Sequence, residues 1–363
     1  MRIALIHQDL FFQGGEYVVA KLANGLAARG HEVHVIVSKV HTDIARQNPE
    51  AKPFRLASDV RFHVLPFRRA LLNIVPLALM LRQRRYDVIL PNTGHYNLCV
   101  AYAKRLLGIK APTVYIEHNL IQPTTNKRNR MALRAARHIV AVSKGVRQAV
   151  VDSGVTEDKV SVVYNPVFDA DFAKKKAQAA QHPWLRSRHP FTFIAAGALG
   201  ARKGFDWLLK AFAHVHAKEP LARLIIFGRG EEENALSNQI QDSGLQEVVS
   251  LPGFTDGLLA EMMSADCFVL SSRRETFGIV LAEALGCNLD VVSADCPYGP
   301  REVLCDGALG QLVPVDDVNA LAVAMLKVIR GEWKAAKAFD PSLYENDAVI
   351  ARYEKLLVEV VHP

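Results

Sequence analysis

Short apolar runs alternate with longer amphipathic segments along most of the chain. In the first half, segments with helical spacing at 16–30, 98–108 and 144–154 separate the apolar runs, which lie at 2–7, 32–38, 87–92, 113–119, 138–143 and 160–167. Runs of this length that alternate with amphipathic helices are typical of βα units. The alternation therefore predicts a parallel sheet with helices on both faces.

The alternation is interrupted once and then restarts. Residues 168–190 are polar and basic and contain two prolines, which is typical of a linker. Beyond them, helical segments at 205–219 and 279–286 accompany further apolar runs, which lie at 191–197, 223–230, 248–254, 265–272 and 290–296. The sequence thus predicts an α/β protein with two Rossmann-like domains that face each other across a cleft.

The length also favours two domains, because single hydrophobic cores usually stop growing at about 250–300 residues and this chain has 363. We place the first Rossmann-like domain at 1–167, the linker at 168–190 and the second domain at 191–338. The tail, 339–363, is expected to be a helix that can cross back to the first domain. Ligands of such sheets bind at the carboxyl ends of the strands, which is where candidate site residues are sought.

Charge is distributed unevenly, although the net charge is only +7. Residues 1–165 contain 24 Lys and Arg against 11 Asp and Glu, whereas residues 166–363 contain 20 against 26. This asymmetry favours an anionic partner for the first half. No helix-turn-helix, zinc-finger or RNP pattern accompanies the charge, so no nucleic-acid partner is expected. An anionic membrane, a phosphorylated acceptor and a merely solvated basic face are the alternatives.

Several features limit the class of protein. Residues 1–10 lack a small-residue cleavage site and are better explained as a first strand than as a signal peptide. The longest uncharged apolar run, 70–81, is too short to span a bilayer. Asp169-Ala170-Asp171 resembles a DxD metal motif but lies in the predicted linker, so we expect no metal site. The absence of a CxxC pair predicts buried free thiols for all five cysteines, which are Cys99, Cys267, Cys287, Cys296 and Cys305.

Two predicted strand-to-helix loops carry groups that can bind phosphate. Gly14-Gly15 follows the first strand, and backbone N–H groups at a helix start can hold an anion, although a plain tight turn would also explain the pair. Arg202 and Lys203 follow the strand at 191–197 and direct cations at the predicted cleft. The alternative for them is an ordinary solvated loop.

The stretch 271–286, SSRRETFGIVLAEALG, contains two glutamates eight residues apart. If a helix starts near Gly278, Glu275 lies just before it and Glu283 lies nearly on the same face, since two turns take 7.2 residues. Carboxylates accept hydrogen bonds from sugar hydroxyls, and the first amides of the helix are unpaired donors. The spacing suits a nucleotide sugar, whereas a buried ion pair is the alternative for Glu283.

With these motifs in order, the chain resembles the retaining glycosyltransferases of family 4, which have the GT-B fold. The resemblance runs nearly from end to end. It rests on GGEYVVAKLANGLAARGHEVHVIV (14–37), VAVSKGVRQAVV (140–151), YNPV (164–167), RKGFDWLLKAF (202–212), FGRG (227–230), LPGFTD (251–256), ADCFVLSSRRETFGIVLAEALG (265–286) and CPYGPREVL (296–304). The E-x7-E pattern in its ETFG setting is the most specific of them.

The resemblance implies a role for each matching residue. Lys203, with Arg202 beside it, would hold the donor diphosphate together with the Gly14-Gly15 amides. His118 matches the family's histidine near the transferred sugar, and a hydrogen-bonded structural histidine is the alternative reading of that position. Lys203, Glu275 and His118 are the candidate catalytic residues.

The remaining matches concern the sugar and the base of the donor. Glu275, with the amides of the following Thr276-Phe277-Gly278 segment, would grip the hexose hydroxyls. Glu283 would accept from the ribose hydroxyls, and Gly253-Phe254 would lie against the nucleobase. The chain departs from the family pattern at Ala198, where an arginine is usual, and at 288–290, where Gly-x-Pro is usual. The first departure removes a cation that Arg202 can replace.

The implied reaction moves a hexose or N-acetylhexosamine, with retention, from a nucleotide diphosphate sugar to a glycan or lipid-linked acceptor. A UDP-sugar is the expected donor, cell-surface polysaccharide or lipopolysaccharide synthesis is the expected process, and no metal or other cofactor is expected. The alternatives are a nucleotide-sugar 2-epimerase of the same fold and a non-catalytic nucleotide-sugar-binding protein. The sugar, the acceptor and the oligomeric state are not determined by these motifs.

Basic residues flank two segments of the first half, 67–85 and 120–137. Each Lys or Arg near an anionic leaflet adds about 1 kcal/mol to membrane binding. We therefore expect a cytoplasmic protein that can bind peripherally to the inner face of the cytoplasmic membrane. The residues hypothesised to contact membrane or acceptor are Arg68, Arg69, Arg82, Arg84, Arg85, Lys127, Arg128 and Arg130.

Overall fold

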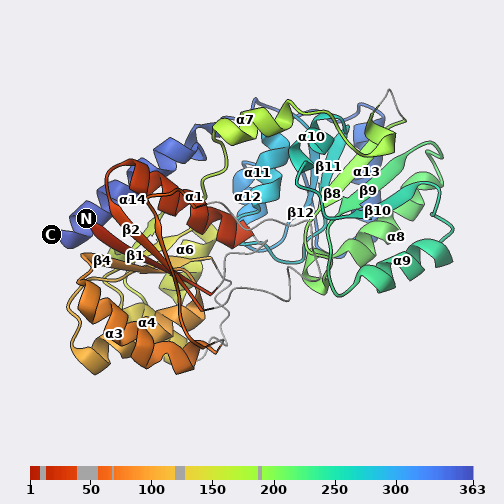
Figure 1. The fold of residues 1–363 in the computed structure, drawn as a ribbon. Coiled ribbons are helices and arrows are strands. Elements are labelled where there is room, and N and C mark those ends of the chain that lie inside the picture. The colour runs from red at the N-terminus through yellow and green to blue at the C-terminus, as the bar shows by residue number, and fades with distance from the viewer. Residues whose placement is uncertain (9–13, 39–55, 68, 119–126, 187–189, 363) are drawn as a thin grey trace. The chain divides into compact units, whose positions relative to one another are not determined.

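The computed structural model describes residues 1–8, 14–38, 56–67, 69–118, 127–186 and 190–362. The chain divides into two compact units, Met1–Pro166 with Ser342–Pro363 and Val167–Pro341. Each unit has its own parallel sheet with helices packed against it (Figure 1).

The first unit is built on two sets of parallel strands that a bridge between Ile89 and Thr113 joins. The strands between the edges are almost completely buried, as expected for a sheet covered on both faces. In spatial order they are β3 (Arg61–Val64), β2 (Glu32–Val37), β1 (Arg2–His7) and β4 (Val88–Pro91), then β5 (Val114–Glu117), β6 (His138–Ala141) and β7 (Val160–Val162).

Helices connect and cover these strands. Ser143 caps α6 by accepting a hydrogen bond from the Val146 N–H at 3.2 Å, and α4 ends at Gly108 in the left-handed conformation. The helices are α1 (Gly14–Ala28), α3 (Ile74–Arg84) preceded by the 3₁₀ turn η1 (Ala70–Asn73), α4 (Gly94–Leu107), α5 (Lys127–Ala135), α6 (Lys144–Asp152), η2 (Glu157–Lys159) and α14 (Asn346–Val361).

The C-terminal helix α14 belongs to the first unit, where it packs against α1. Ile350 is fully buried and lies directly over Gly25, where a Cβ atom would come within 2.6 Å of Ile350 Cγ1. Glu354 also accepts hydrogen bonds from Arg29 at 3.2 Å and His31 at 3.0 Å. The glycine thus lets the two helices approach closely.

The second unit contains a six-stranded parallel sheet over a core that includes Phe193, Trp207, Phe212 and Met325. Its strands in spatial order are β10 (Val249–Gly253), β9 (Arg223–Phe227), β8 (Thr192–Ala196), β11 (Cys267–Leu270), β12 (Asp290–Ala294) and β13 (Gln311–Val313). Its helices are α7 (Ala170–Lys176), η3 (Pro183–Leu185), η4 (Ala201–Lys203), α8 (Phe205–His216), α9 (Glu233–Asp242), α10 (Leu258–Met263), α11 (Ile279–Gly286), α12 (Gly299–Val303) and α13 (Val318–Ile329). The 3₁₀ turn η5 (Pro341–Leu343) lies at the boundary of the two units.

The parallel sheets of the two units confirm the predicted α/β class, and each predicted apolar run contains a strand. Two short strands, β3 and β13, were not predicted. β3 is largely exposed and carries Arg61 and His63, so it lacks an apolar run. The segment 168–190 contains a short helix, α7, which Asp169 caps by accepting from the Phe172 N–H at 2.8 Å.

All five cysteines are free thiols, as predicted. Four of them are buried, but the prediction of burial is wrong for Cys305, which is half-buried. No described helix is both long and apolar enough to cross a membrane. In the 288–290 turn, Asn288 takes a positive φ of 61°, a conformation that asparagine tolerates where the family pattern has glycine.

The contact between Gly25 and Ile350 leads to a first prediction. Gly25→Val should lower the free energy of unfolding by about 1–3 kcal/mol, because the added side chain overlaps a buried isoleucine. Ile350→Ala should cost about 2–5 kcal/mol by leaving a cavity. Urea denaturation followed by circular dichroism measures both.

The double variant is the control, since removal of the isoleucine makes room for the side chain added on α1. Its loss should be clearly smaller than the sum of the two single losses. Additive losses would mean that α14 and α1 do not approach as described.

Candidate functional site

The loop after β8 brings a lysine to the carboxyl edge of the second sheet. The side chain of Lys203 runs past Gly197, where a Cβ atom would lie 2.9 Å from Lys203 Cε. Gly204 then starts α8 with a φ of 66°, and a Cβ there would lie 2.2 Å from the Ser271 carbonyl oxygen. This glycine allows the β8 loop to lie directly against the end of β11.

The Lys203 side chain forms an ion pair with Glu275. Glu275 is 7% exposed, and its Oε1 atom accepts hydrogen bonds from Lys203 Nζ at 2.5 Å and from Ser272 Oγ at 2.8 Å. Arg202 lies farther away, with its guanidinium 3.5 Å from Oε2. One carboxylate oxygen is therefore used within the protein, while the other faces a largely exposed arginine.

The environment keeps Glu275 ionised. Burial alone would raise the pKa of this carboxyl, but the charges of Lys203 and Arg202 and the hydrogen bonds from Lys203 and Ser272 outweigh it. The pKa of Glu275 consequently lies below its ordinary value. A buried, negatively charged acceptor beside two cations can bind hydroxyl groups and a phosphate at neighbouring points.

Arg273 holds the loop that presents these groups. Its guanidinium donates to Asp206 at 2.9 and 2.8 Å, to Asp316 at 2.8 Å and to the Ala201 carbonyl at 2.7 Å. Its backbone N–H donates to the Arg202 carbonyl at 2.8 Å. Arg273 is thus committed to structure, and this role was not predicted from the sequence.

The helix start predicted near Gly278 is confirmed. Gly278 has a φ of 90° and precedes α11, and no side chain among the described residues caps that helix. The loop after β12 pairs with the same segment through a bridge between Glu275 and Tyr298. Gly299 lies so close that a Cβ would be 2.2 Å from the Phe277 carbonyl oxygen.

Glu283 lies on α11 and is half-buried. Burial, together with the charge of Glu283, raises the pKa of the neighbouring Cys287 thiol to about 12. Thr276, Phe277 and Gly278 form the turn between Glu275 and the start of α11, which carries Glu283. The predicted sugar-binding residues and Glu283 thus lie along one turn and the helix that follows it.

Gly253 ends β10, and its neighbour Phe254 is 37% exposed. A Cβ at Gly253 would lie 3.4 Å from the guanidinium of Arg229, which comes from the loop after β9. Neither Arg229 nor Ser272 was predicted as a site residue. Both lie within motifs on which the family resemblance rests, FGRG and SSRRETFG. Membership of these motifs could have identified them as site residues.

The first unit carries the other predicted site residues. Gly14-Gly15 form the first turn of α1, and a Cβ at Gly15 would meet no described atom within 4 Å. The pair therefore opens a helix rather than forming a separate tight turn. His118 lies at the carboxyl end of β5, and its Nε2 atom is buried without a hydrogen-bond partner among the described residues.

Two histidines share this edge of the first sheet. Burial and the nearby His7 lower the pKa of His118 to about 3, and burial lowers the pKa of His7 to about 4. Both imidazoles are therefore neutral at neutral pH, so they can donate or accept hydrogen bonds but carry no charge.

The basic residues predicted to meet a membrane or acceptor are only partly described. Arg69, Arg82 and Arg85 are exposed, and Arg84 and Arg130 are half-buried. Arg82 donates to the Leu107 carbonyl at 2.9 Å. Arg68 and the side chains of Lys127 and Arg128 lie outside the described residues.

Comparison with known proteins identifies two domains in the chain. A model described as Glycosyltransferase Family 4 matches residues 12–170, and one described as Glycosyl transferases group 1 matches residues 178–344. Among solved structures, Anabaena Alr3699/HepE in complex with UDP and glucose has a TM-score of 0.77 at 22% identity and covers 98% of this chain and 99% of its own. Such neighbours confirm the GT-B fold.

Two curated relatives illustrate the range of similarity. The UDP-N-acetylglucosamine--peptide N-acetylglucosaminyltransferase GtfA subunit of Streptococcus gordonii is 35% identical over 129 residues, 35% of this chain and 25% of that protein. The N-acetyl-alpha-D-glucosaminyl L-malate synthase of Bacillus anthracis is 22% identical over 374 residues, 96% of this chain and 94% of that protein. The chain spans about a fifth to two fifths of the length of the first curated relatives it matches.

The low pKa values of His7 and His118 predict how the free energy of unfolding depends on pH. Below pH 6.5 the unfolded chain binds protons on these residues that the folded chain does not, so the free energy of unfolding should fall as the pH drops from 6.5 towards 4. His118→Gln should reduce that slope by about 1 kcal/mol per pH unit, averaged between pH 7 and pH 5. Urea denaturation at pH 7 and pH 5 measures it.

His7→Gln serves as the matched variant and should have a similar effect. The two substitutions together should reduce the slope further than either alone. If His118→Gln has the wild-type slope, its imidazole is not held neutral in the folded protein.

Proposed function

We propose that this chain, which carries a Glycosyltransferase Family 4 domain followed by a Glycosyl transferases group 1 domain, is a glycosyltransferase that uses a nucleotide diphosphate sugar. The observation that carries the proposal is the buried Glu275 carboxylate, held ionised by Lys203 at the carboxyl edge of the second sheet. The named relatives are transferases and synthases, which does not favour the 2-epimerase alternative.

The leaving group of this reaction is a nucleoside diphosphate, so stabilisation of its developing negative charge is the main catalytic task. Lys203 and Arg202 provide two cations for it, and the amide of Gly15 would add a backbone donor. Lys203 is 12% and Arg202 53% exposed at the side chain. The lysine is therefore the cation with a fixed position. Arg202 can move toward the phosphate, where it would replace the arginine that the family usually has at the position of Ala198.

Glu275 would bind the hydroxyls of the transferred sugar. An ionised carboxylate offers several acceptor sites, and Lys203 and Ser272 occupy only the Oε1 side. The Oε2 side, which Arg202 approaches at 3.5 Å, remains for hydroxyl groups. Glu283, one helical segment away, would accept from the ribose.

His118 acts as a neutral hydrogen-bonding group in this proposal. With a pKa of about 3 it does not exchange a proton with the acceptor at neutral pH. Its buried Nε2 atom would instead hydrogen-bond the sugar. In a retaining transfer without an enzymic nucleophile, the leaving phosphate would take the acceptor's proton.

We further propose a UDP-sugar carrying a hexose or N-acetylhexosamine as donor, with no metal or other cofactor required. The support is that solved neighbours of the same fold hold UDP, UDP and glucose, or UDP-glucose. Gly253 and Phe254, next to Arg229, would lie against the base.

The acceptor is proposed to be a glycan or a lipid-linked glycan of the cell surface, reached from the cytoplasmic face of the membrane. The support is an exposed apolar surface on η1 and α3, formed by Leu71, Leu72, Val75 and Leu79, each 47–56% exposed. These positions lie on one side of the helix, and the arginines Arg69, Arg82 and Arg85 flank them. An apolar face bordered by cations is typical of a segment that lies on an anionic membrane.

The donor site predicts different effects for the two glutamates. Glu275→Gln should lower kcat by about 10²–10³-fold and change UDP affinity little, because it removes a charged acceptor for the sugar. Glu283→Gln should weaken UDP binding about tenfold by removing a ribose contact. Kinetics with UDP-sugars and isothermal titration with UDP separate the two.

The exposed Glu247→Gln is the matched control and should change neither quantity. A thermal-shift screen of UDP-, GDP- and ADP-sugars chooses the donor for these measurements. A wild-type protein that binds UDP but neither transfers nor hydrolyses any donor would favour the non-catalytic alternative.

The α3 surface predicts binding to anionic vesicles. Replacing Leu71, Leu72 and Leu79 with serine should lower co-sedimentation with phosphatidylglycerol-containing vesicles more than tenfold, because each buried leucine contributes about 1.5–3 kcal/mol. Replacement of Leu221, Val323 and Val358, which are also exposed but separate from α3, should have no such effect. Equal sedimentation of wild type with anionic and neutral vesicles at low salt would contradict the membrane proposal.

A further inference from the structure

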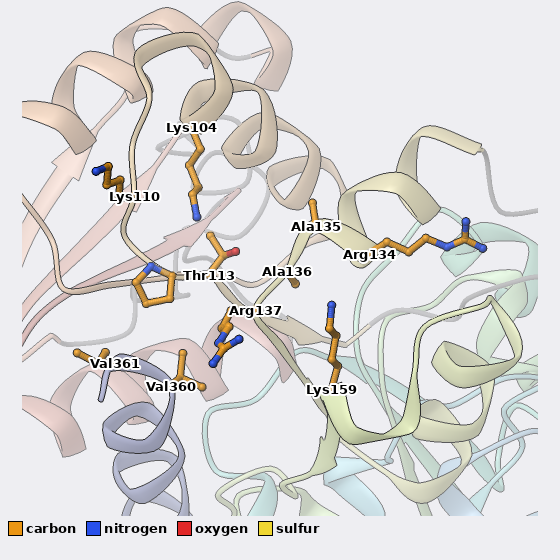
Figure 2. A pocket seen from close by; sticks show the side chains of 11 residues that line it. Lys104, Lys110, Thr113, Arg134, Ala135, Ala136, Arg137, Lys159, Val360 and Val361 are labelled. Atoms are coloured by element: carbon orange, nitrogen blue, oxygen red, sulfur yellow. The ribbon is translucent and has the colours of Figure 1, made fainter. Parts of the chain in front are cut away.

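A pocket of about 470 Å³ opens at the edge of the first unit opposite His118. Thr113, one of its lining residues, immediately precedes β5, and Arg137 and Lys159 immediately precede β6 and β7. The pocket therefore lies at the amino ends of these strands, whereas His118 lies at the carboxyl end of β5. The last turn of α14, with Val360 and Val361, closes one side (Figure 2).

Among the described residues, five cations and no carboxylate line this pocket. Figure 2 shows Lys104 and Lys159 extending into the space from opposite sides, with Arg137 at its lower rim and Lys110 and Arg134 at its margins. They come from α4, the loop after it, the end of α5, the turn before β6 and η2. Convergence from separate elements distinguishes the pocket from a charged run on one helix.

Among the described residues none of the five cations forms a salt bridge with a carboxylate, although the charge of Lys159 helps to lower the pKa of the adjacent Asp158. Lys104 is half-buried, and its ammonium donates to the Ala111 carbonyl at 2.5 Å. Burial lowers the pKa of Lys104 without an opposing carboxylate. An anion bound between these cations would gain favourable Coulomb energy from each of them.

The acids nearby lie to one side. Asp158 and Glu359 line an adjoining hollow that shares Arg137 and Lys159 with the pocket. Both act on His138, which lines the same hollow, and Asp158 also interacts with Lys159, whereas no described carboxylate acts on Lys104. Their charges repel an anion from that side, so the favourable region is the space between Lys104, Arg137 and Lys159.

We infer that this pocket binds a phosphate-bearing anion, supplied either by a phospholipid head group or by a soluble phosphate compound. Arginine binds phosphate through paired N–H groups and lysine as a point charge, and the pocket offers both. Its volume is within the range of small-molecule sites, about 300–1,000 Å³, and suits more than a single phosphate group. Ala135 and Ala136, which have small side chains, also line it.

The site is separate from the proposed donor site. It shares no residue with the Lys203 and Glu275 cluster, which belongs to the second unit. It also contains neither His118 nor Gly15. Its occupation would attach the first unit to a phosphate-bearing partner without entering the reaction, so its failure and the failure of the proposed glycosyltransferase activity are independent.

The test compares wild type with Arg137→Gln/Lys159→Gln, which removes two of the three cations around the favourable region. Lys210→Gln/Lys218→Gln is the matched control, since both lysines are exposed on the second unit. Binding of pyrophosphate is measured by titration calorimetry with UDP present at saturating concentration, so that the proposed diphosphate site at Lys203 is already occupied. Binding to vesicles with about 30% phosphatidylglycerol in phosphatidylcholine is measured by co-sedimentation at low salt. Unchanged thermal midpoints verify folding.

We expect the pocket variant to lose about tenfold or more in affinity for at least one probe, while the control stays within about twofold of wild type. Loss of pyrophosphate binding would identify a soluble phosphate compound. Loss of vesicle binding alone would identify the lipid head group. The α3 serine variant should lower vesicle binding but leave pyrophosphate binding unchanged. The inference is overturned if wild type binds neither probe, or if the pocket variant binds both as wild type does.

Discussion

A buried carboxylate must be paired with a cation to stay ionised. The loops at the carboxyl end of the second sheet meet this requirement for Glu275. Glu275 is almost completely buried, and an ionised group in that position costs several kcal/mol unless it is paired and hydrogen-bonded. Lys203 provides the charge from a loop 72 residues earlier in the chain. The pairing is possible because β8 and β11 are neighbours in the sheet, so the loops that follow them lie at the same edge.

The surrounding residues keep this pair in place while leaving room beside it. Gly204 and Gly299 let the flanking backbones approach closer than any side chain would allow. Arg273 ties the Lys203 turn to Asp206 and Asp316, so the loop is positioned by an ion network and not by the ligand. A preorganised carboxylate whose second oxygen faces only the largely exposed Arg202 can accept hydrogen bonds from a hydroxylated ligand.

The first unit uses the two ends of its sheet in different ways. At the carboxyl end, burial keeps His7 and His118 neutral, which suits hydrogen bonding without charge. At the amino end, cations from several elements meet without carboxylate partners among the described residues. Because parallel strands run in the same direction, the carboxyl ends of all strands lie at one end of the sheet and their amino ends lie at the other. Part of the excess positive charge of the first half is thus gathered at the amino end of this sheet.

The sequence by itself determined the kind and order of most elements, because buried parallel strands are continuous apolar runs and their helices have one apolar face. It also identified Lys203 and Glu275 as candidates, though not their direct contact. β3 was not predicted because it is largely exposed and partly polar, and β13 because it is only three residues long. Only the tertiary structure showed that Arg273 forms structural ion pairs, and that Lys104, Arg137 and Lys159 line one pocket. Each of those cations looks like ordinary surface charge in sequence, since proximity between distant residues depends on strand order and not on spacing along the chain.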